Sequence, residues 1–465
     1  KLTMKAPKFR EFISEAKDNP NKLKILVLSD EPEKSKLFHT AKRVLDEAPK
    51  LGHKVYVVFI DGAYIKNEDG IKTIHNVDDD KGFVIDDINT IAIIRGSITR
   101  KDAWLDLLSQ LEKAGVSCIN NRATVNICVD KYRTFLRLAD YGLTQPQTVL
   151  VPNKDGVETA VENLGTGYPM IMKTLRGSKG VGVIFIESER SLESIVQLIY
   201  KENDEAELLI QEYIEMDGDI RVLVLDGKVL AAMKRDVIKG DFRSNFSQGG
   251  KVKEFKMTEL EVEQSILAAK AVNGHYVAVD FIPSKNREKI PPYVIEVNSS
   301  PGTEGIEEAT GRNLIKELIQ HFEDPKKRYK TPTEIGHREV LDIKPFGEIE
   351  AKFDTGNSAK AVIHADKMKV NDKKVTWTLL GKTITSNIIE KINVEVGGMR
   401  DYDEERYVIK LDIEFLGSLY KDVEFTLDDR SGRSLILVNR AFMSRANVMV
   451  NPARKYVVTT KYSLE

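Results

Sequence analysis

Short apolar runs alternate with amphipathic segments near the start of the chain. Residues 24–29, 55–60 and 91–94 each form an apolar run with the length of a buried strand. The segment from about 35 to 50, between the first two runs, repeats apolar residues at helical spacing. Buried strands in strand–helix–strand order predict a parallel α/β domain over residues 23–122.

Beyond residue 130 the expected strands become longer and pair locally. Strands are predicted at residues 170–174, 181–187, 208–213, 220–225 and 228–234. The first two flank a glycine-rich turn, and the last two flank Asp226-Gly227, a strong signal for a two-residue hairpin. This order predicts an α+β arrangement and not a continued parallel sheet.

The sequence pattern changes again over the last 130 or so residues, from mixed helices and strands to mostly strands. A charged, proline-bearing linker at 326–334 precedes a mostly β domain at 335–465. Its expected strands are residues 375–380, 391–396, 406–415, 423–427, 434–438 and 456–460. The full division is an extension at 1–22, the α/β domain, a central domain at 123–325 with lobes at about 140–212 and 213–325, the linker and the β domain.

Composition restricts the classes of partner. Lys and Arg number 70 and Asp and Glu 72, a net charge of −2, which argues against DNA binding through phosphate neutralisation. No apolar run approaches the roughly 18 residues of a membrane span, and the first residues lack the core of a signal peptide. Two cysteines suit a reducing compartment, so we expect a cytoplasmic protein that contacts neither DNA nor membrane.

Candidate phosphate-binding residues lie around the glycine-rich turn. Gly177, Ser178 and Gly180 could bring backbone N–H groups close to phosphate oxygens, or could form a plain hairpin turn. Lys173 lies inside the preceding apolar strand, where an amine either reaches the surface or is aimed at an anion. Lys131, at the start of an expected helix, is a second candidate cation.

Candidate metal ligands lie on two later strands. Glu296 and Asn298 are two residues apart, so on a strand they share a face. Asp280 lies within another apolar strand and would face them if the two strands pair. Three oxygen ligands of this kind suit Mg²⁺, and the alternative is a set of solvent-facing polar residues.

Arginines near these acids favour an anionic substrate. Arg221 and Arg243 offer planar forks that match carboxylate and phosphate groups. Arg235, Lys239 and Arg243 form a basic cluster in a nearly neutral chain, which a solvated loop would also explain.

Residues 24–322 resemble the RimK-type ATP-grasp ligases, which add glutamate to the C-terminus of a small-subunit ribosomal protein or build related glutamyl peptides. The matching stretches are residues 130–133, 171–173, 177–182, 211–214, 218–221, 240–245, 296–302 and 304–307. The family's Asn-Ala-Ser-Pro-Gly reads Asn-Ser-Ser-Pro-Gly here, from Asn298 to Gly302. The resemblance implies an ATP-grasp fold and a carboxylate–amine ligase that works through an acyl phosphate.

The resemblance also implies roles for individual residues. The expected ATP-binding residues are Lys131, Lys173, Gly177, Ser178, Gly180, Glu212, Tyr213, Asp219, Arg221, Ser244 and Asn245. Among them, Glu212 and Tyr213 would read adenine and Asp219 would lie near the ribose. Asp280, Glu296 and Asn298 would hold two Mg²⁺ ions, with Mn²⁺ as a substitute, and Arg243 would be catalytic and bind the acidic substrate.

The tail resembles a second family, the RimB-like, retropepsin-like proteases with a β-barrel fold. The matching stretches are residues 336–339, 351–356, 429–431 and 450–452. Asp354-Thr355-Gly356 is the aspartic-protease signature, but Asn357 and Asn439 depart from the family pattern. A dyad of carboxylates built from one such tripeptide needs two copies of the domain, and Asp354 would be its catalytic residue.

The sequence is compatible with three hypotheses about function. The first is a glutamate ligase acting on a peptide or protein acceptor, active as a homo-oligomer. The second is a peptidase regulated by the ATP-grasp part, and the third is a scaffold whose tail recruits a peptide. The intact set of Asp280, Glu296 and Asn298 favours the ligase.

Overall fold

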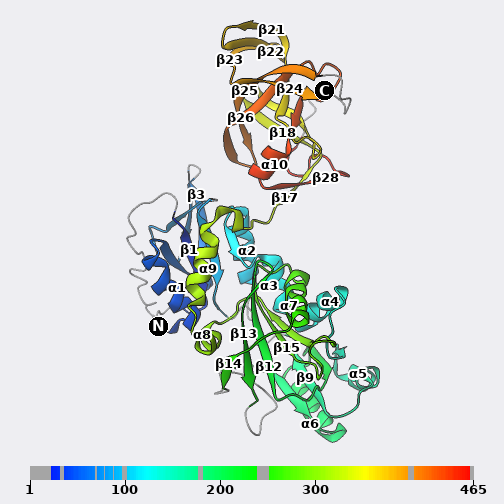
Figure 1. Ribbon diagram of the computed structural model, residues 1–465. Coiled ribbons are helices and arrows are strands. Elements are labelled where there is room, and N and C mark those ends of the chain that lie inside the picture. The colour runs from blue at the N-terminus through cyan, green and yellow to red at the C-terminus, as the bar shows by residue number, and fades with distance from the viewer. Residues whose placement is uncertain are drawn as a thin grey trace, which may run out of the picture. The chain divides into compact units, whose positions relative to one another are not determined.

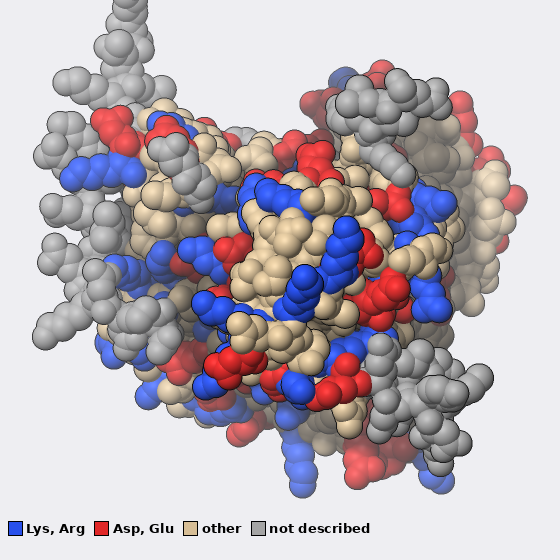
Figure 2. Space-filling model, turned by 90° about the horizontal axis from the view of Figure 1, so that it is seen from above, with Lys and Arg blue, Asp and Glu red and all other residues tan. Residues whose placement is uncertain are grey.

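In the computed structural model, the described residues are 22–31, 36–68, 71–77, 79–86, 88–96, 102–175, 182–237, 251–395 and 403–460. The chain forms two compact units, Lys1–Lys330 and Thr331–Glu465 (Figure 1). Figure 2 shows Lys and Arg side chains interspersed with Asp and Glu on the face that it draws, without a broad field of one sign. Among the described residues, no helix combines the length and the apolar character needed to cross a membrane.

The first unit begins with the predicted parallel sheet. Its strands, in the order β2-β1-β6-β7, are β2 (Lys54–Phe59), β1 (Lys24–Ser29), β6 (Thr90–Ile94) and β7 (Ser117–Ile119). Helix α1 (His39–Lys50) connects the first two strands in the chain, and α2 (Ala103–Lys113) precedes β7. Because apolar residues of β1 pack on both faces, the strand reads as a continuous apolar run.

A small antiparallel sheet interrupts this domain and was not predicted. Its strands are β3 (Tyr64–Glu68), β4 (Ile71–His75) and β5 (Phe83–Ile85). They are mixed in polarity because one face is exposed, so no apolar run marks them in the sequence.

Two further sheets follow in the first unit. The smaller has the order β10-β9-β11-β8 and consists of β8 (Thr148–Val151), β9 (Met170–Thr174), β10 (Val183–Ile186) and β11 (Leu208–Glu212), with helices α5 (Val157–Leu164) and α6 (Glu189–Glu202). The larger has the order β14-β13-β12-β15-β16 and consists of β12 (Gly218–Leu225), β13 (Lys228–Asp236), β14 (Val252–Glu254), β15 (Tyr276–Ile282) and β16 (Tyr293–Asn298). The predicted hairpin joins β12 and β13, and Asp226 and Gly227 have φ of 44° and 71°.

Helices surround the larger sheet and join it to the first domain. They are α3 (Arg122–Cys128), α4 (Lys131–Asp140), α7 (Glu259–Ala271), α8 (Glu304–Thr310) and α9 (Leu314–Glu323). Apolar residues of α1, α9 and the larger sheet belong to one buried cluster. The predicted combination of a parallel α/β domain and an α+β ATP-grasp fold is therefore confirmed.

The second unit contains the predicted β-barrel. Strands β18 (Arg338–Lys344), β19 (Gly347–Phe353), β27 (Ile436–Val438), β20 (Ala361–His364), β26 (Ser418–Asp428) and β25 (Asp403–Phe415) pair in this order, and β25 closes on β18. The remaining elements are β17 (Thr333–Gly336), β21 (Asp366–Asn371), β22 (Lys374–Leu379), β23 (Lys382–Asn387), β24 (Glu390–Glu395), α10 (Arg440–Arg445) and β28 (Val448–Asn451).

One strand predicted in the tail is wrong. Residues 456–460 form no strand, although their sequence, Tyr-Val-Val-Thr-Thr, is rich in β-branched residues. The fully buried carboxylate of Glu339 accepts the backbone N–H groups of Val457, Val458 and Thr459 at 2.8, 3.4 and 3.1 Å. The segment therefore satisfies its backbone through a side chain and not through a strand ladder.

Candidate ligase site

A pocket lies where the smaller sheet meets helix α4 and strand β16. It contains about 400 Å³ of empty space, including its opening to solvent. Its lining residues are Cys128, Lys131, Thr134, Phe135, Leu138, Gln145, Thr148, Lys173, Leu209, Gln211, Ile295 and Glu296. Two candidate phosphate-binding lysines and one candidate metal ligand, which are far apart in the sequence, therefore line the same pocket.

Lys131 is placed by the local structure at the start of α4. Asp130 caps this helix, because its Oδ1 accepts the backbone N–H groups of Tyr132 and Arg133 at 3.0 and 2.9 Å. The backbone N–H of Lys131 donates to the carbonyl of Leu175, just after β9, at 3.1 Å. Lys131 is thereby fixed beside the strand that carries the second lysine.

Lys173 on β9 takes part in a polar chain inside the pocket. Its Nζ donates to Gln211 Oε1 at 2.6 Å, and Gln211 Nε2 donates to Thr148 Oγ1 at 2.8 Å. Burial is the main cause that lowers the pKa of Lys173, Glu296 opposes it and Lys131 adds to it, and together they bring the pKa to about 8. The amine therefore lies inside the pocket, which excludes the alternative of a surface lysine.

The glycine-rich turn is described only at its two ends. Strands β9 and β10 pair antiparallel, with Lys173 opposite Val183, and the Thr174 N–H donates to the Gly182 carbonyl at 3.0 Å. This confirms that the turn connects two paired strands. The expected phosphate-binding residues Gly177, Ser178 and Gly180 lie outside the described residues.

The expected adenine-binding residues lie at the end of β11. The backbone N–H of Glu212 donates to the Gln147 carbonyl at 2.8 Å, and its Oε2 accepts the Gln147 N–H at 3.1 Å. The Tyr213 ring meets Phe185 edge-on, with centroids 5.0 Å apart. Both residues begin the connection from the smaller to the larger sheet, and their contact with adenine stays a prediction.

The three candidate metal ligands lie on the paired strands β15 and β16. Asp280 is directly opposite Glu296, so their side chains project to the same face of the sheet. Asn298 lies two residues after Glu296 on β16 and projects to this face too. Asn298 Oδ1 accepts the Ser300 N–H at 2.9 Å. Carboxylate and amide oxygens on one face form a donor set that fits Mg²⁺, the metal expected from the resemblance.

Asp280 is already bound to two arginines. Arg221 donates to it through Nε at 2.8 Å and Nη2 at 2.6 Å, and Arg235 donates through Nη2 at 2.9 Å. Asp280 is 2% exposed, and burial would raise its pKa, but the two guanidinium groups lower it to about 2. Asp280 therefore stays ionised in a buried place.

Asp219, expected beside a ribose, lies in a buried ion pair, and its contact with a ribose stays a prediction. Asp219 is 3% exposed, and both of its carboxylate oxygens accept from Arg235, one of them from Nε at 2.7 Å. Arg235, in turn, is 4% exposed, so it belongs to no solvated basic cluster. The sequence could not reveal this, because an aspartate and an arginine on adjacent strands become partners only through the register of the sheet.

Part of the expected basic surface cannot be placed. Arg243, Ser244 and Asn245 lie outside the described residues, as does Lys239. Arg221 is described, and its side chain is 18% exposed while it binds Asp280. Of the arginines expected on the substrate side, Arg221 and Arg235 are described, and both donate to the candidate metal ligand Asp280.

Two residues of the first domain, neither of them singled out by sequence reasoning, hold the loop after the candidate metal ligands. Asn120 is fully buried, and its Nδ2 donates to the carbonyls of Tyr276 and Ser299 at 2.6 and 2.7 Å. Arg95 Nη1 donates to the Ser300 carbonyl and, at 3.1 Å, to Ser300 Oγ. Arg95 follows the predicted buried strand at residues 91–94, which is the one sequence signal that could have marked it, whereas Asn120 follows β7, which was not predicted.

In the second unit, Asp354 directly follows β19. Its backbone N–H donates to the Val438 carbonyl at 3.0 Å, and its Oδ1 accepts the Gly356 N–H at 3.0 Å. Asn439, one of the departures from the family pattern, accepts the Phe442 N–H at 3.1 Å as the cap of α10 and donates to the Ala359 carbonyl at 2.5 Å. Asn439 thus holds the loop that carries Asp354.

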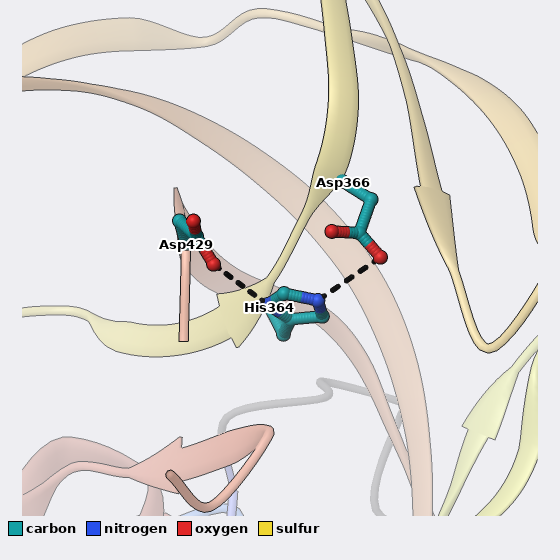
Figure 3. Close-up of side chains that lie close together, drawn as sticks. All are labelled: His364, Asp366 and Asp429. Carbon is teal, nitrogen blue, oxygen red and sulfur yellow. Dashed lines mark ion pairs between the residues drawn. The ribbon is translucent and has the colours of Figure 1, made fainter. Parts of the chain in front are cut away.

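A histidine between two aspartates lies at the end of β20 (Figure 3). His364 Nε2 is 3.1 Å from Asp366 Oδ2, and Nδ1 is 3.7 Å from Asp429 Oδ1. The backbone N–H of Arg430 donates to Nδ1 at 2.9 Å, so the neutral ring carries its proton on Nε2 beside Asp366. A metal ion at Nε2 would displace that proton, and Nδ1 cannot take it up because it already accepts the Arg430 N–H. Hydrogen bonding therefore accounts for the arrangement of these three side chains better than a metal ion does.

The chain matches two protein families, one over each unit. The family model described as "RimK-like ATP-grasp domain" matches residues 128–322, and "Retropepsin-like aspartic endopeptidase RimB" matches residues 335–461. A "Probable alpha-L-glutamate ligase" of Methanococcoides burtonii is 32% identical over 314 residues, which cover 67% of this chain and 99% of that protein. A protein of the same name from Coxiella burnetii is 34% identical over 310 residues, covering 66% and 98%.

Solved structures with similar folds are more distant in sequence. The RimK domain ATP-grasp protein of Sphaerobacter thermophilus is 16% identical with a TM-score of 0.48, over 64% of this chain and 98% of that chain. The D-alanine–D-alanine ligase of Bacillus anthracis in complex with ATP is 18% identical with a TM-score of 0.49, over 66% and 97%.

Proposed function

Because this chain belongs to the family of RimK-type ATP-grasp ligases, with a RimB-like domain after it, we propose that it joins glutamate to a peptide or protein acceptor. The enzyme is an ADP-forming ligase, and ATP and Mg²⁺ follow from its family. The observation that carries the proposal is the arrangement of Lys131, Lys173 and Glu296 around one pocket, with Asp280 opposite Glu296 on the neighbouring strand.

The proposed reaction has two steps. A substrate carboxylate attacks the γ-phosphate of ATP and releases ADP, which leaves an acyl phosphate. An amine then attacks the acyl carbon, phosphate leaves, and an amide forms. Lys131 and Lys173 offset the negative charge of the phosphates, as does Mg²⁺ where it is bound.

The remaining residues take roles that rest on the resemblance. Gly177, Ser178 and Gly180 would cover the phosphates with backbone N–H groups, and Glu212 and Tyr213 would border the adenine. Asp280, Glu296 and Asn298 would hold two Mg²⁺ ions, for which Mn²⁺ can substitute. Arg243 would bind the carboxylate of the acidic substrate, with Ser244 and Asn245 beside it.

The proposal is tested by the products of the purified protein. The protein is incubated with ATP, Mg²⁺ and each amino acid in turn, with and without a peptide ending in glutamate, and the products are measured by mass spectrometry. We expect ADP and a ladder of products that differ by one glutamyl residue. ADP formation without any new amide, for every amino acid and acceptor, would contradict the proposed function.

A second activity is proposed for the tail, which the RimB family model matches. Its tripeptide Asp354-Thr355-Gly356 directly follows β19 of the barrel. We infer that Asp354 cleaves peptides as half of a dyad, because the chain contains this tripeptide once and two carboxylates must share a proton. The dyad would then form between two copies, which is also the reason for proposing a homo-oligomer.

A further inference from the structure

Five charged side chains form a row on one face of the larger sheet. Arg235 on β13 lies opposite Asp219 on β12, and Arg221, two residues along β12, lies opposite Asp280 on β15. Asp280 in turn lies opposite Glu296 on β16. Residues that face each other across antiparallel strands, and residues two apart on one strand, project to the same side. The row crosses four strands, and Arg235 is its one member for which the resemblance implies no role.

Arg235 is a buried link between two carboxylates. Its Nε and Nη2 both donate to Asp219, the first at 2.7 Å, and Nη2 also donates to Asp280 Oδ2 at 2.9 Å. Burial alone would lower the pKa of Arg235, but Asp280 and Asp219 outweigh it and raise the pKa. Arg235 therefore stays charged, and it has no exposed fork to offer a substrate.

The two arginines on Asp280 differ in exposure. The side chain of Arg221 is 18% exposed and that of Arg235 is 5% exposed. Arg221 contributes two of the three hydrogen bonds to Asp280, one on each oxygen. If Arg221 turns towards a phosphate, the bond from Arg235 to Oδ2 still holds the Asp280 carboxylate in place.

The count of lone pairs leaves room for a metal ion. A carboxylate offers about four lone-pair sites, and the three hydrogen bonds to Asp280 use two on Oδ2 and one on Oδ1. One site on Oδ1 is left. Arg235 donates to Oδ2 and not to Oδ1, so it fixes Asp280 without competing for the oxygen that a cation would bind.

We propose that Arg235, held by Asp219, is a positioning residue that orients Asp280 for the metal ion of the nucleotide complex. This inference rests on the proposed function for the role of Asp280 as a metal ligand. Partners of this kind behind a ligating carboxylate contribute roughly 10- to 100-fold to metal affinity.

The test measures metal binding and not catalysis. Mn²⁺ is titrated into the full chain with a non-hydrolysable ATP analogue, and free Mn²⁺ is followed by electron paramagnetic resonance. We expect Arg235→Met to weaken Mn²⁺ binding at least roughly tenfold, with Arg235→Lys in between because an ammonium group lacks the fork. Thermal unfolding of each variant is recorded in parallel.

A second arginine–carboxylate pair in the same unit, of which only the carboxylate is buried, supplies the control. Arg287 donates to Glu261 through Nε and Nη2, both at 2.7 Å, and Glu261 is 1% exposed. Arg287→Met should lower the unfolding temperature without changing the Mn²⁺ affinity. Equal affinities in the parent, Arg287→Met and Arg235→Met would show that Arg235 is only structural and would overturn the inference.

Asp219→Asn carries the test if Arg235→Met does not fold. Asparagine keeps the shape of the side chain and one acceptor oxygen but holds Arg235 more weakly. The Mn²⁺ affinity of Asp219→Asn should therefore be lower than that of the parent. An affinity equal to the parent's would contradict the inference. The binding test contains no amino acid, so its result does not depend on ligation. A parent that binds Mn²⁺ and nucleotide in this test but forms no glutamyl product in the ligation assay would refute the proposed function alone.

Discussion

Asp280 in the first unit and Asp354 in the second are both proposed to act chemically, and their surroundings differ. Asp280 is buried, accepts three hydrogen bonds from two arginines and faces Glu296 on the next strand. Asp354 is half-buried, and its side chain accepts one backbone N–H from its own loop. The first carboxylate is fixed by other charged side chains of the chain, and the second is fixed mainly by the loop that carries it.

The two proposed sites also differ in how much of each one chain supplies. The oxygens and cations proposed to act in ligation come from strands and helices of one chain, since Lys131, Lys173 and Glu296 line the same pocket. An aspartic dyad needs two carboxylates in contact, and the chain has one Asp-Thr-Gly. We therefore expect ligation to belong to a single chain and peptide cleavage to belong to a pair.

The largest expected effect is the loss of ligation in Glu296→Ala. Removing a metal ligand takes away several kcal/mol of transition-state stabilisation, so the rate should fall about 10³-fold or more. Glutamyl product is quantified by mass spectrometry at saturating Mg²⁺. Glu254→Ala, on exposed β14 of the same sheet, serves as the control and should retain the parent's rate. Normal turnover in Glu296→Ala would exclude it as a metal ligand.

Asp354→Asn should separate the two activities. The amide cannot share a proton as the carboxylate pair does, so cleavage of peptides, including glutamyl products, should fall to background while ligation is unchanged. Product length is followed over time in the parent and in the variant. Identical time courses, with no peptide cleaved by the parent, would leave the tail with a binding or assembly role.

A moderate effect is expected from the pH dependence of Lys173. Its pKa is lowered to about 8, so the amine loses its charge as pH rises through 8 and attraction of the triphosphate weakens. Above that pH, kcat/KM for ATP should fall by up to about tenfold per pH unit, because this ratio reports the free enzyme. Lys173→Arg should remove the decline, since arginine stays charged. A decline that persists in Lys173→Arg would assign it to another group.

The smallest effect concerns the loop of Asp354. Asn439→Ala removes the cap of α10 and the bond to Ala359, and a lost cap costs about 1 kcal/mol of unfolding free energy. Calorimetry of the full chain should show the loss in the transition of the second unit, with ligation unaffected. An unchanged transition would show that the loop does not depend on Asn439.

The sequence predicted the elements of the ligase unit better than the partners of its charges. Apolar runs and the Asp226-Gly227 turn marked the strands, and the spacing of Glu296 and Asn298 placed both on one face. The pairing of Arg235 with Asp219 depends on the register between β12 and β13, which no local pattern contains. Asn120 was missed for the same reason, since its partners lie more than 150 residues away.

In the tail, strand-like sequence marked the barrel strands but failed at residues 456–460. That segment has the β-branched composition of a strand, yet the N–H groups of residues 457–459 donate to Glu339, which is 0% exposed. A buried carboxylate that replaces a strand partner cannot be recognised before the fold is known. The sequence also flagged Asn439 as a departure from its family, but not that it holds the Asp354 loop.

The most direct test of one-chain ligation and two-chain cleavage is activity in mixed assemblies. Parent chains and chains carrying both Glu296→Ala and Asp354→Asn are co-expressed in varied proportion, and both activities are measured per total chain. The account predicts that ligation falls in proportion to the fraction of parent chains, while peptide cleavage falls as the square of that fraction. Ligation that follows the square, or cleavage that follows the first power, would contradict it.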